Sequence, residues 1–391
     1  MPAFSARRRG FALAAAIMAI VVVGAIIAGA FFASTQDYRI GRNTLVEQRA
    51  FAVAEYGLNK EVGNWDRSRN LAPPAGQAVG TVIDTNVYVA GDDTARVRIT
   101  RLNRNTYWVV SEGRASIGNA QTQSMRRTSS MVRLAYPFVN VRGAITTAGS
   151  LDLRGSATIS GNDVPDTQLA GWQQCDSIGR DSVPGVAARA GANIDSTSHL
   201  TGDPPLVRDS AAADSNTYIR YGSETWNTLR DNADIWLASS VDPFPAGTAT
   251  TCYNTNANHL TNWGEPFRVP VAGASPIVLG CRNYFPIIYV NGNLTLNGNG
   301  RGQGILLVNG DLTINGTFDF YGVIIVRDDI ERGTGTALIH GAVLTRNANL
   351  GDRSVWAGTQ DVRFSKCAVE SALSASAILI PTRERGWAQL F

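Results

Sequence analysis

This 391-residue chain has one long run of apolar residues near its start. The run extends from Phe11 to Phe32 and is preceded by three arginines, Arg7 to Arg9. A helix of ~20 apolar residues spans a bilayer, and basic residues before it hold that end in the cytoplasm. The run exceeds the ~7–15 residues of a secretory signal core and lacks a clear cleavage site, which favours an anchor over a cleaved signal. Residues 11–33 are therefore predicted to form one transmembrane helix.

The same helix is predicted to continue outside the membrane over residues 34–63. Apolar residues recur there at helical spacing, at Leu45, Phe51, Ala52, Leu58 and Val62. Such a stripe is typical of a helix that packs against a folded domain on one side. At ~1.5 Å per residue, a helix from Phe11 to Val62 would be about 75–80 Å long.

Beyond a linker that contains Pro and Gly, the pattern changes to the two-residue period of β-strands. Segments rich in Val, Ile, Thr and Tyr extend over residues 81–90, 96–102, 106–115 and 121–135. The segment from Arg96 to Leu102 alternates strictly, which is typical of a strand with one solvent-exposed face. Residues 79–137 are therefore predicted to form an antiparallel β head that rests against the helix.

An internal repeat of about 18 residues follows later in the chain. Apolar tetrapeptides at 287–290, 305–308 and 323–326 fall in step, and residues 291–298 recur as 309–316. A short strand, an Asn-Gly turn, a second strand and a second turn describe one coil of a solenoid. The sequence thus predicts a short parallel β-helix over residues 287–350. The alternative is an antiparallel meander in which the Asn-Gly pairs form two-residue hairpins.

The pattern of the 18-residue repeat also matches residues 143–161, which are predicted to form one further coil. Residues 162–286 then read as a large insertion between the coils, and residues 351–391 as a C-terminal cap. The predicted fold class is α+β and β-rich: a long N-terminal helix, an antiparallel sheet and a parallel β-helix with its insertion. The insertion is expected either to cover an open end of the solenoid or to bind surface polysaccharide through Trp226 and Trp263.

Four cysteines follow the predicted membrane segment, at positions Cys175, Cys252, Cys281 and Cys367. Their spacing matches no metal or redox motif, and an even number in an exported domain predicts two disulfides. Proximity favours Cys252 with Cys281, which leaves Cys175 with Cys367. The other two pairings, and unpaired thiols, remain open on the sequence alone.

Composition and motifs do not indicate an enzyme. The net charge of +3 indicates no nucleic-acid partner, and the histidines, His199, His259 and His340, are far apart. No catalytic or phosphate-binding motif occurs, and neither a metal nor a cofactor is predicted. Some parallel β-helices cleave polysaccharides with acidic and arginine side chains, and only in that sense are the following residues candidates: Asp311, Asp319, Arg327, Asp328 and Asp329.

The stretch Arg7-Arg8-Arg9-Gly10-Phe11, with the apolar run after it, resembles the leader of type IV pilin-like proteins. This resemblance implies that prepilin peptidase removes residues 1–10 by cutting between Gly10 and Phe11, and that the new terminal amine is methylated. Most members carry a glutamate five residues into the mature chain, where this chain has Ala15. In the family that glutamate neutralises the amine of a neighbouring subunit in apolar surroundings. Its absence implies a minor subunit at the tip, where no subunit above presents an amine.

Residues 48–58, QRAFAVAEYGL, are similar to a Q-x-A-F-x-A-A-E-x-x-L stretch in PilX N-terminal-type pilus assembly proteins. The resemblance implies a non-enzymatic subunit of a type IV pilus or a type II secretion pseudopilus. Its partners would be the inner membrane, prepilin peptidase and other pilin-like subunits. The head would lie in the periplasm, and at the cell surface once assembled. The alternative function is a membrane-anchored adhesin or carbohydrate-binding β-helix protein.

Overall fold

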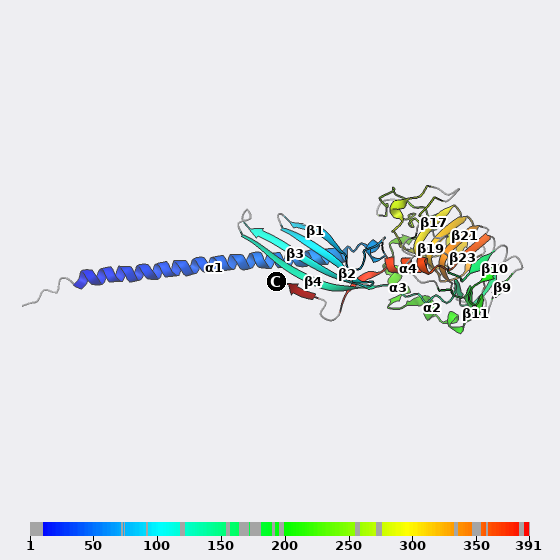
Figure 1. The fold of residues 1–391 in the computed structure, drawn as a ribbon, viewed down its shortest axis with the longest axis horizontal. Helices are drawn as coiled ribbons and strands as arrows, with labels where there is room; N and C mark the ends of the chain where they lie inside the picture. Colours follow the sequence, from blue (N-terminus) through cyan, green and yellow to red (C-terminus); the bar gives the residue numbers. More distant parts are fainter. Residues whose placement is uncertain are drawn as a thin grey trace, which may run out of the picture.

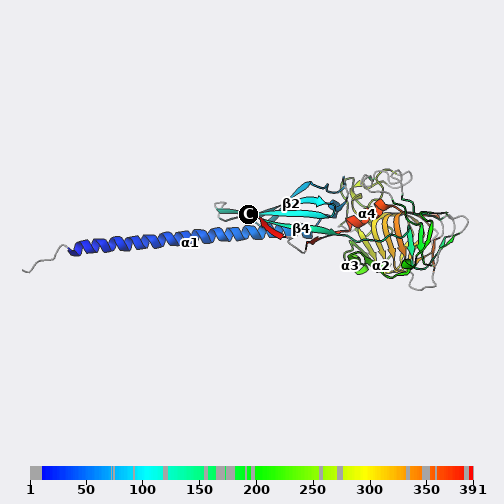
Figure 2. The same ribbon diagram turned by 60° about the horizontal axis from the view of Figure 1, so that its bottom comes forward.

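The computed structural model describes residues 11–71, 73, 75–90, 93–117, 122–153, 157–163, 172, 181–189, 192–194, 199–254, 259–270, 276–331, 335–345, 353–356, 359–382 and 387–390. Figure 1 shows an elongated molecule whose parts follow one another along its long axis. A long helix, the stem, leads to an antiparallel sheet, the head. Stacked parallel strands form the far end, here called the distal domain (residues 136–377), and Figure 2 shows the same order after rotation.

The stem, α1 (Phe11–Gly63), is one continuous helix of 53 residues. Its apolar first half is exposed, whereas one side of its second half is buried against the head. The buried side consists of Val46, Ala50, Val53, Ala54, Gly57 and Leu58. This corrects the predicted stripe, because Leu45 and Ala52 are exposed. The contact uses small residues, which let the backbone of α1 approach the backbone of the head sheet closely. A pattern of bulky apolar residues does not reveal such a face.

The head is an antiparallel sheet in the order β1–β2–β3–β4. Its strands lie close to the predicted segments and are β1 (Val82–Ala90), β2 (Asp93–Asn103), β3 (Thr106–Ile117) and β4 (Thr122–Ala135). The turn of 3-10 helix η1 (Arg67–Asn70) lies between the stem and β1. The C-terminal strands β24 (Ile378–Pro381) and β25 (Trp387–Leu390) pair with β4. The end of the predicted cap therefore belongs to the head, where it satisfies an otherwise open strand edge.

Parallel pairing organises the repeats of the distal domain. One sheet contains, in order, β15 (Ile287–Val290), β17 (Gly300–Val308), β19 (Thr317–Val326) and β21 (Thr336–Thr345). A second contains β16 (Leu294–Leu296), β18 (Leu312–Ile314) and β20 (Ile330–Glu331). Equivalent residues of successive repeats are neighbours, such as Ile287, Ile305 and Val323. The Asn-Gly turns do not close antiparallel hairpins, so the meander alternative is wrong.

The segment 143–161 stacks beyond the last repeat, and part of the predicted insertion continues the same stack. The paired strands are β5 (Ile145–Thr147) with β21, β6 (Ser150–Leu153) with β22 (Arg353–Trp356), and β7 (Thr158–Ser160) with β23 (Thr359–Arg363). The strands of the predicted insertion are β8 (Val186–Ala188), β9 (Ala192–Ile194), β10 (His199–Thr201), β11 (Leu206–Arg208) and β14 (Ile235–Leu237). β8 pairs with β5, and β14 pairs with β15 at the opposite end. The predicted separation of coils and insertion is therefore corrected, because an open parallel edge binds the next strand whatever its place in the sequence.

Short elements complete the distal domain. They are η3 (Ser210–Ala213), α2 (Asn216–Ile219), β12 (Arg220–Tyr221), β13 (Glu224–Thr225), α3 (Trp226–Asp231), η4 (Leu279–Cys281) and α4 (Lys366–Ala375). Helix α4 contacts β17, β19 and β21 of the distal domain and also η1, so it links the distal domain to the segment that leads into the head. Ser365 starts this helix by accepting a hydrogen bond from the backbone N–H of Ala368. The core of the stack includes the fully buried rings of Phe318 and Phe320.

Candidate functional site

The first half of the stem is apolar and uncovered. It contains a segment long and apolar enough to cross a membrane, and none of the residues that the structure describes buries its most apolar stretch. Phe11, the predicted first residue of the mature chain, begins α1, and Gly10 lies outside the described residues. Ala15 is exposed on this segment. Phe11 and Ala15 therefore lie toward the end of the stem that points away from the head (Figure 1).

The head sheet turns one face to α1 and the other to solvent. Arginines from three adjacent strands gather on the solvent side: Arg96 and Arg98 of β2, Arg114 of β3, and Arg127 and Arg133 of β4. We call these five residues the arginine face. The strict alternation from Arg96 to Leu102 predicts that one face of this strand is exposed to solvent. The five charges come together only through the register between the three strands, which the tertiary structure sets.

Two carboxylates hold four of these arginines in place. Asp84 accepts hydrogen bonds from Arg96 at 2.9 Å and from Arg98 at 3.1 Å. Glu112 accepts from Arg114 at 2.8 Å and from Arg127 at 2.9 Å. Burial alone would raise the pKa of Glu112, but the hydrogen bonds from the two guanidinium groups lower it below its usual value. Each carboxylate serves two cations, so the face keeps an excess of positive charge.

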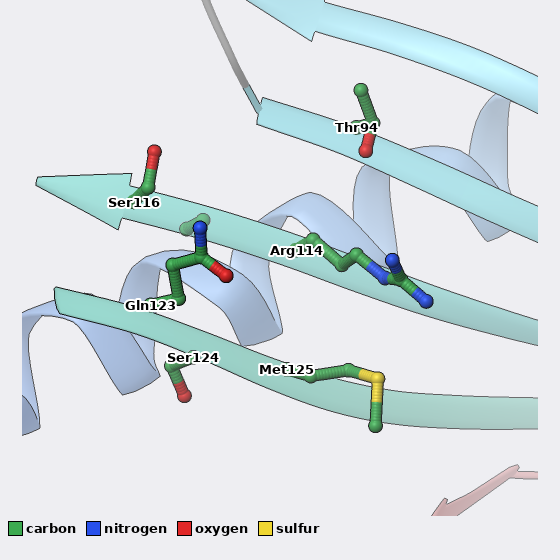
Figure 3. A pocket seen from close by; sticks show the side chains of 7 residues that line it. Thr94, Arg114, Ser116, Gln123, Ser124 and Met125 are labelled. Carbon is green, nitrogen blue, oxygen red and sulfur yellow. The ribbon is translucent and has the colours of Figure 1, made fainter. Parts of the chain in front are cut away.

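An open pocket and an apolar pair lie on the same face. The pocket has a volume of about 500 Å³ and is lined by Thr94, Arg114, Ala115, Ser116, Gln123, Ser124 and Met125. Figure 3 shows the Arg114 and Met125 side chains extending along neighbouring strands on the side of the sheet away from α1. Trp108 and Met131 are directly opposite one another further along β3 and β4, and each is 40% exposed. The face therefore combines guanidinium groups with accessible apolar surface.

A buried ion pair joins two segments of the distal domain. Arg301 of β17 donates to the Glu265 carboxylate at 2.8 Å, and the two side chains are 6% and 0% exposed. Glu265 also accepts from the backbone N–H groups of Phe267 and Val278. Arg301 donates in addition to the carbonyl of Pro276. This network ties the predicted insertion to the repeat, and its deep burial makes it a structural element rather than a ligand site.

Stacked rings cross the strands beside this ion pair. Trp172 stacks on Tyr321 with ring centroids 5.5 Å apart, and Tyr321 stacks on His340 at 4.6 Å. The Arg268 guanidinium lies 4.3 Å from the centre of the Trp172 ring. Burial lowers the pKa of His340 to about 4, so its ring is neutral at pH 7. His199 lies on β10 and is exposed, whereas His340 is buried on β21, so the structure does not bring these two histidines into one site.

Asp319 is expected to make the distal domain less stable as the pH rises. Burial raises the pKa of its carboxyl to about 6, although Arg301 offsets part of this shift. Because the unfolded value is ~3.9, stability falls between about pH 4 and pH 6 as the buried group ionises. We expect Asp319→Asn to raise the free energy of unfolding by roughly 1–2 kcal/mol at pH 8 and to leave it unchanged at pH 4. Urea unfolding at both pH values measures this, and an equal effect at both would contradict it.

The cysteines brace the same domain. Cys252 and Cys281 form a disulfide with an S–S distance of 2.02 Å, the pair favoured by their proximity in the sequence. Cys367, in the first turn of α4, is also disulfide-bonded, and no cysteine of the described part is free. Cys175, the partner expected for Cys367, lies outside the described residues.

Trp226 and Trp263 are not platforms for a ligand. Their exposed fractions are 5% and 0%, so both predicted sites are corrected to core positions. Trp226 packs edge-on against Tyr289, and the Trp263 indole N–H donates to the carbonyl of Leu260. Large aromatic side chains contribute most when buried, and sequence spacing does not reveal which side of a segment faces inward. Trp236 on the edge strand β14 is half exposed and lies 4.8 Å from the Tyr289 ring.

Three acidic residues lie in the loops that follow β17 and β19, and a fourth, Glu331, ends β20. We call Asp311, Asp328, Asp329 and Glu331 the acidic corner. Asp311 accepts from the Asp329 backbone N–H at 3.0 Å and from the Asn293 amide at 3.2 Å, so these positions form a ladder across successive repeats. Arg327 donates to Asn309 and lies over the Trp226 ring. Among the residues that the structure describes, no three His, Cys, Asp or Glu side chains are placed to hold a metal ion.

Comparisons with known proteins do not identify a family for this chain. No family model matches the chain, and no curated protein matches it. Among solved structures, the competence-associated pilin ComZ from Thermus thermophilus is 13% identical, with 89% of this chain and 97% of that chain covered. The TM-score of this match is 0.24, which carries no argument about a shared fold. A functional assignment must therefore rest on the residues of this chain.

Proposed function

We propose that this chain is a non-enzymatic, pilin-like subunit of a type IV pilus or a type II secretion pseudopilus. The division of α1 carries the proposal. One half is apolar and uncovered from Ala12 onward, and the other half packs on an antiparallel sheet through positions such as Val46 and Ala54. A helix that is apolar all round needs lipid or other apolar helices around it. A subunit that is stored in a membrane and then assembled into a filament meets both surroundings in turn.

Three features of the sequence support the finer assignment. Arg7 to Arg9 precede the apolar run, which suits a cytoplasmic N-terminus and a head in the periplasm. Gly10 and Phe11 are the residues that prepilin peptidase would separate. Ala15 replaces the usual glutamate, which suits a minor subunit. A tip position would account for Ala15 because no subunit above it presents an amine.

The proposal includes the architecture of the distal domain, which we take to be a short parallel β-helix. Its support is the parallel register of equivalent residues in two separate sheets, with Leu294 opposite Leu312 in one and Ile305 opposite Val323 in the other. The domain would stand on the filament as a rigid extension beyond the head. Polysaccharide binding is a weaker candidate, because Trp226 and Trp263 are buried.

Mass spectrometry of the native N-terminus tests this function. We expect a chain that begins with N-methylated Phe11 in cells that have prepilin peptidase, and an intact Met1 in cells that lack it. The variant Gly10→Val should remain uncut in both, while Pro2→Ala, a change within the leader but away from the cut, should be processed normally. An intact Met1 in normal cells, or a cut beyond Phe32, would overturn the pilin-like assignment. Unchanged pilus number, motility and secretion after deletion of the gene would overturn it as well.

A further inference from the structure

Charge is divided along the molecule. Stem and head, residues 11–135 and 378–391, contain 16 basic and 10 acidic residues, whereas the distal domain contains 16 basic and 22 acidic residues. The total net charge of +3 hides this division. The two parts lie at successive positions along the long axis (Figures 1 and 2). Two parallel copies displaced along that axis would therefore bring opposite charges together.

We infer that the arginine face docks a second copy of this chain, through the acidic corner of that copy's distal domain. The inference rests on the proposed function, because a filament holds its subunits parallel at a fixed axial offset. The same patch is not used on both copies, so the contact is heterologous and can continue from copy to copy.

The arginine face is built to attract an acidic surface. Five arginines oppose two carboxylates, Asp84 and Glu112, and the four arginines bound to these carboxylates are 44–63% exposed. Those hydrogen bonds fix the guanidinium groups yet occupy only some of their donors: Arg96 uses one terminal nitrogen and Arg98 only Nε. Further donors can meet carboxylates of a partner without loss of the existing bonds.

The composition of the face indicates a protein partner. Trp108 and Met131 lie among the arginines, and Trp, Met and Arg are enriched where protein interfaces bury surface. The pocket beside Arg114, with its volume of about 500 Å³, has room for an acidic side chain next to a guanidinium group.

The acidic corner offers the complementary charge in a rigid frame. Its loops are held by the ladder from Asn293 through Asp311 to Asp329. Glu331 accepts one hydrogen bond from the Thr313 hydroxyl, and neither it nor Asp328 makes an ion pair with a described residue. The nearby Arg327 is directed to Asn309 and the Trp226 ring, so it does not neutralise these two carboxylates.

Such a contact would also supply an electrostatic interaction between neighbouring copies that the stem, which has Ala15, does not provide. With Ala15 in place of a glutamate, the membrane end of the stem has no carboxylate to pair with a neighbour's terminal amine. Complementary charges between head and distal domain would set the axial register instead. Copies within a run would use both patches, and a copy at the tip would use one.

Charge-swap complementation with the full-length protein in detergent tests the contact. One variant carries Arg98→Glu and Arg114→Glu, and the other carries Asp328→Arg and Glu331→Arg. Sedimentation at low salt and in 1 M NaCl measures self-association, since the Debye length falls to ~3 Å at 1 M. All variants keep α1, so association through the stem is common to them. Arg220→Glu, which reverses an exposed arginine of the distal domain outside both patches, is the matched control.

We expect wild type and Arg220→Glu to associate equally at low salt and to separate in 1 M salt. Each double variant should weaken association at least ~10-fold, because like charges then meet. An equimolar mixture of the two variants should recover most of the loss, which also shows that both are folded. No recovery, no effect of either variant, or an effect of the arginine variant alone would overturn the contact. A chain that is processed at Gly10 but does not associate overturns this inference only, whereas an unprocessed chain that associates overturns only the proposed function.

Discussion

Replacing Glu265 by alanine is expected to lower the free energy of unfolding of the distal domain by about 3–5 kcal/mol. Glu265 has no exposed surface, and its carboxylate accepts from Arg301 and from two backbone N–H groups. The alanine variant would remove the counter-charge of a guanidinium group that is only 6% exposed and would leave buried N–H groups without an acceptor. Urea unfolding of the full chain, followed by tryptophan fluorescence, measures the loss.

Two further variants show whether burial is the cause. Asp84→Ala removes a carboxylate that also binds two groups, Arg96 and Arg98, but on the exposed head surface, and should cost at most about 1 kcal/mol. The double variant Glu265→Leu with Arg301→Leu removes both members of the ion pair and should lower the free energy of unfolding less than Glu265→Ala alone, since no unpaired guanidinium group stays buried. If Glu265→Ala cost no more than Asp84→Ala, the network would not hold the domain together.

Gly113→Val is expected to detach the stem from the head, at a cost of about 3 kcal/mol or more. A Cβ at this position of β3 would lie 2.2 Å from the carbonyl oxygen of Ala50 and 2.3 Å from the nitrogen of Ala54. Both atoms belong to the α1 backbone, so the clash can be relieved only by moving the whole helix. Hydrogen exchange should become faster in the second half of α1, and limited proteolysis should cut between stem and head.

Gly41→Ala is the matched control for a glycine of the same stem. A Cβ there meets nothing within 4 Å, and alanine is favoured over glycine in a helix by about 1 kcal/mol. We expect this variant to be as stable as the wild type or slightly more stable, with unchanged proteolysis. Equal protection of α1 in Gly113→Val and Gly41→Ala would contradict the close approach of helix and sheet.

Sequence reasoning succeeded where the signal was local. The helix was predicted to end near Val62 and ends at Gly63, and the strand predicted for 106–115 is β3, Thr106–Ile117. Alternation along one strand and an unbroken apolar run depend only on neighbouring residues. The sequence also shows the 18-residue repeat, because stacked strands place equivalent residues side by side and so require similar side chains at a fixed interval.

Sequence reasoning failed where the outcome depended on distant partners. The helix face that packs on the head contains Ala50, Ala54 and Gly57, whose small size matters only because the sheet approaches there. The sequence predicts Trp226 and Trp263 to be accessible, but both are buried in the core of the distal domain. The arginine face has no signature in the sequence, because its five members become neighbours only through the register of three strands.

The sequence by itself determined an apolar helix long enough to cross a membrane, an alternating sheet and an 18-residue repeat, since each is a pattern that the chain carries locally. Tertiary structure decided the order in which the parallel strands stack. It places β5 beyond β21 and β14 beside β15, and it returns β24 to β4. The physical reason is that backbone hydrogen bonds at a strand edge are the same for every sequence, so the choice among edges is made by the packing of the whole chain.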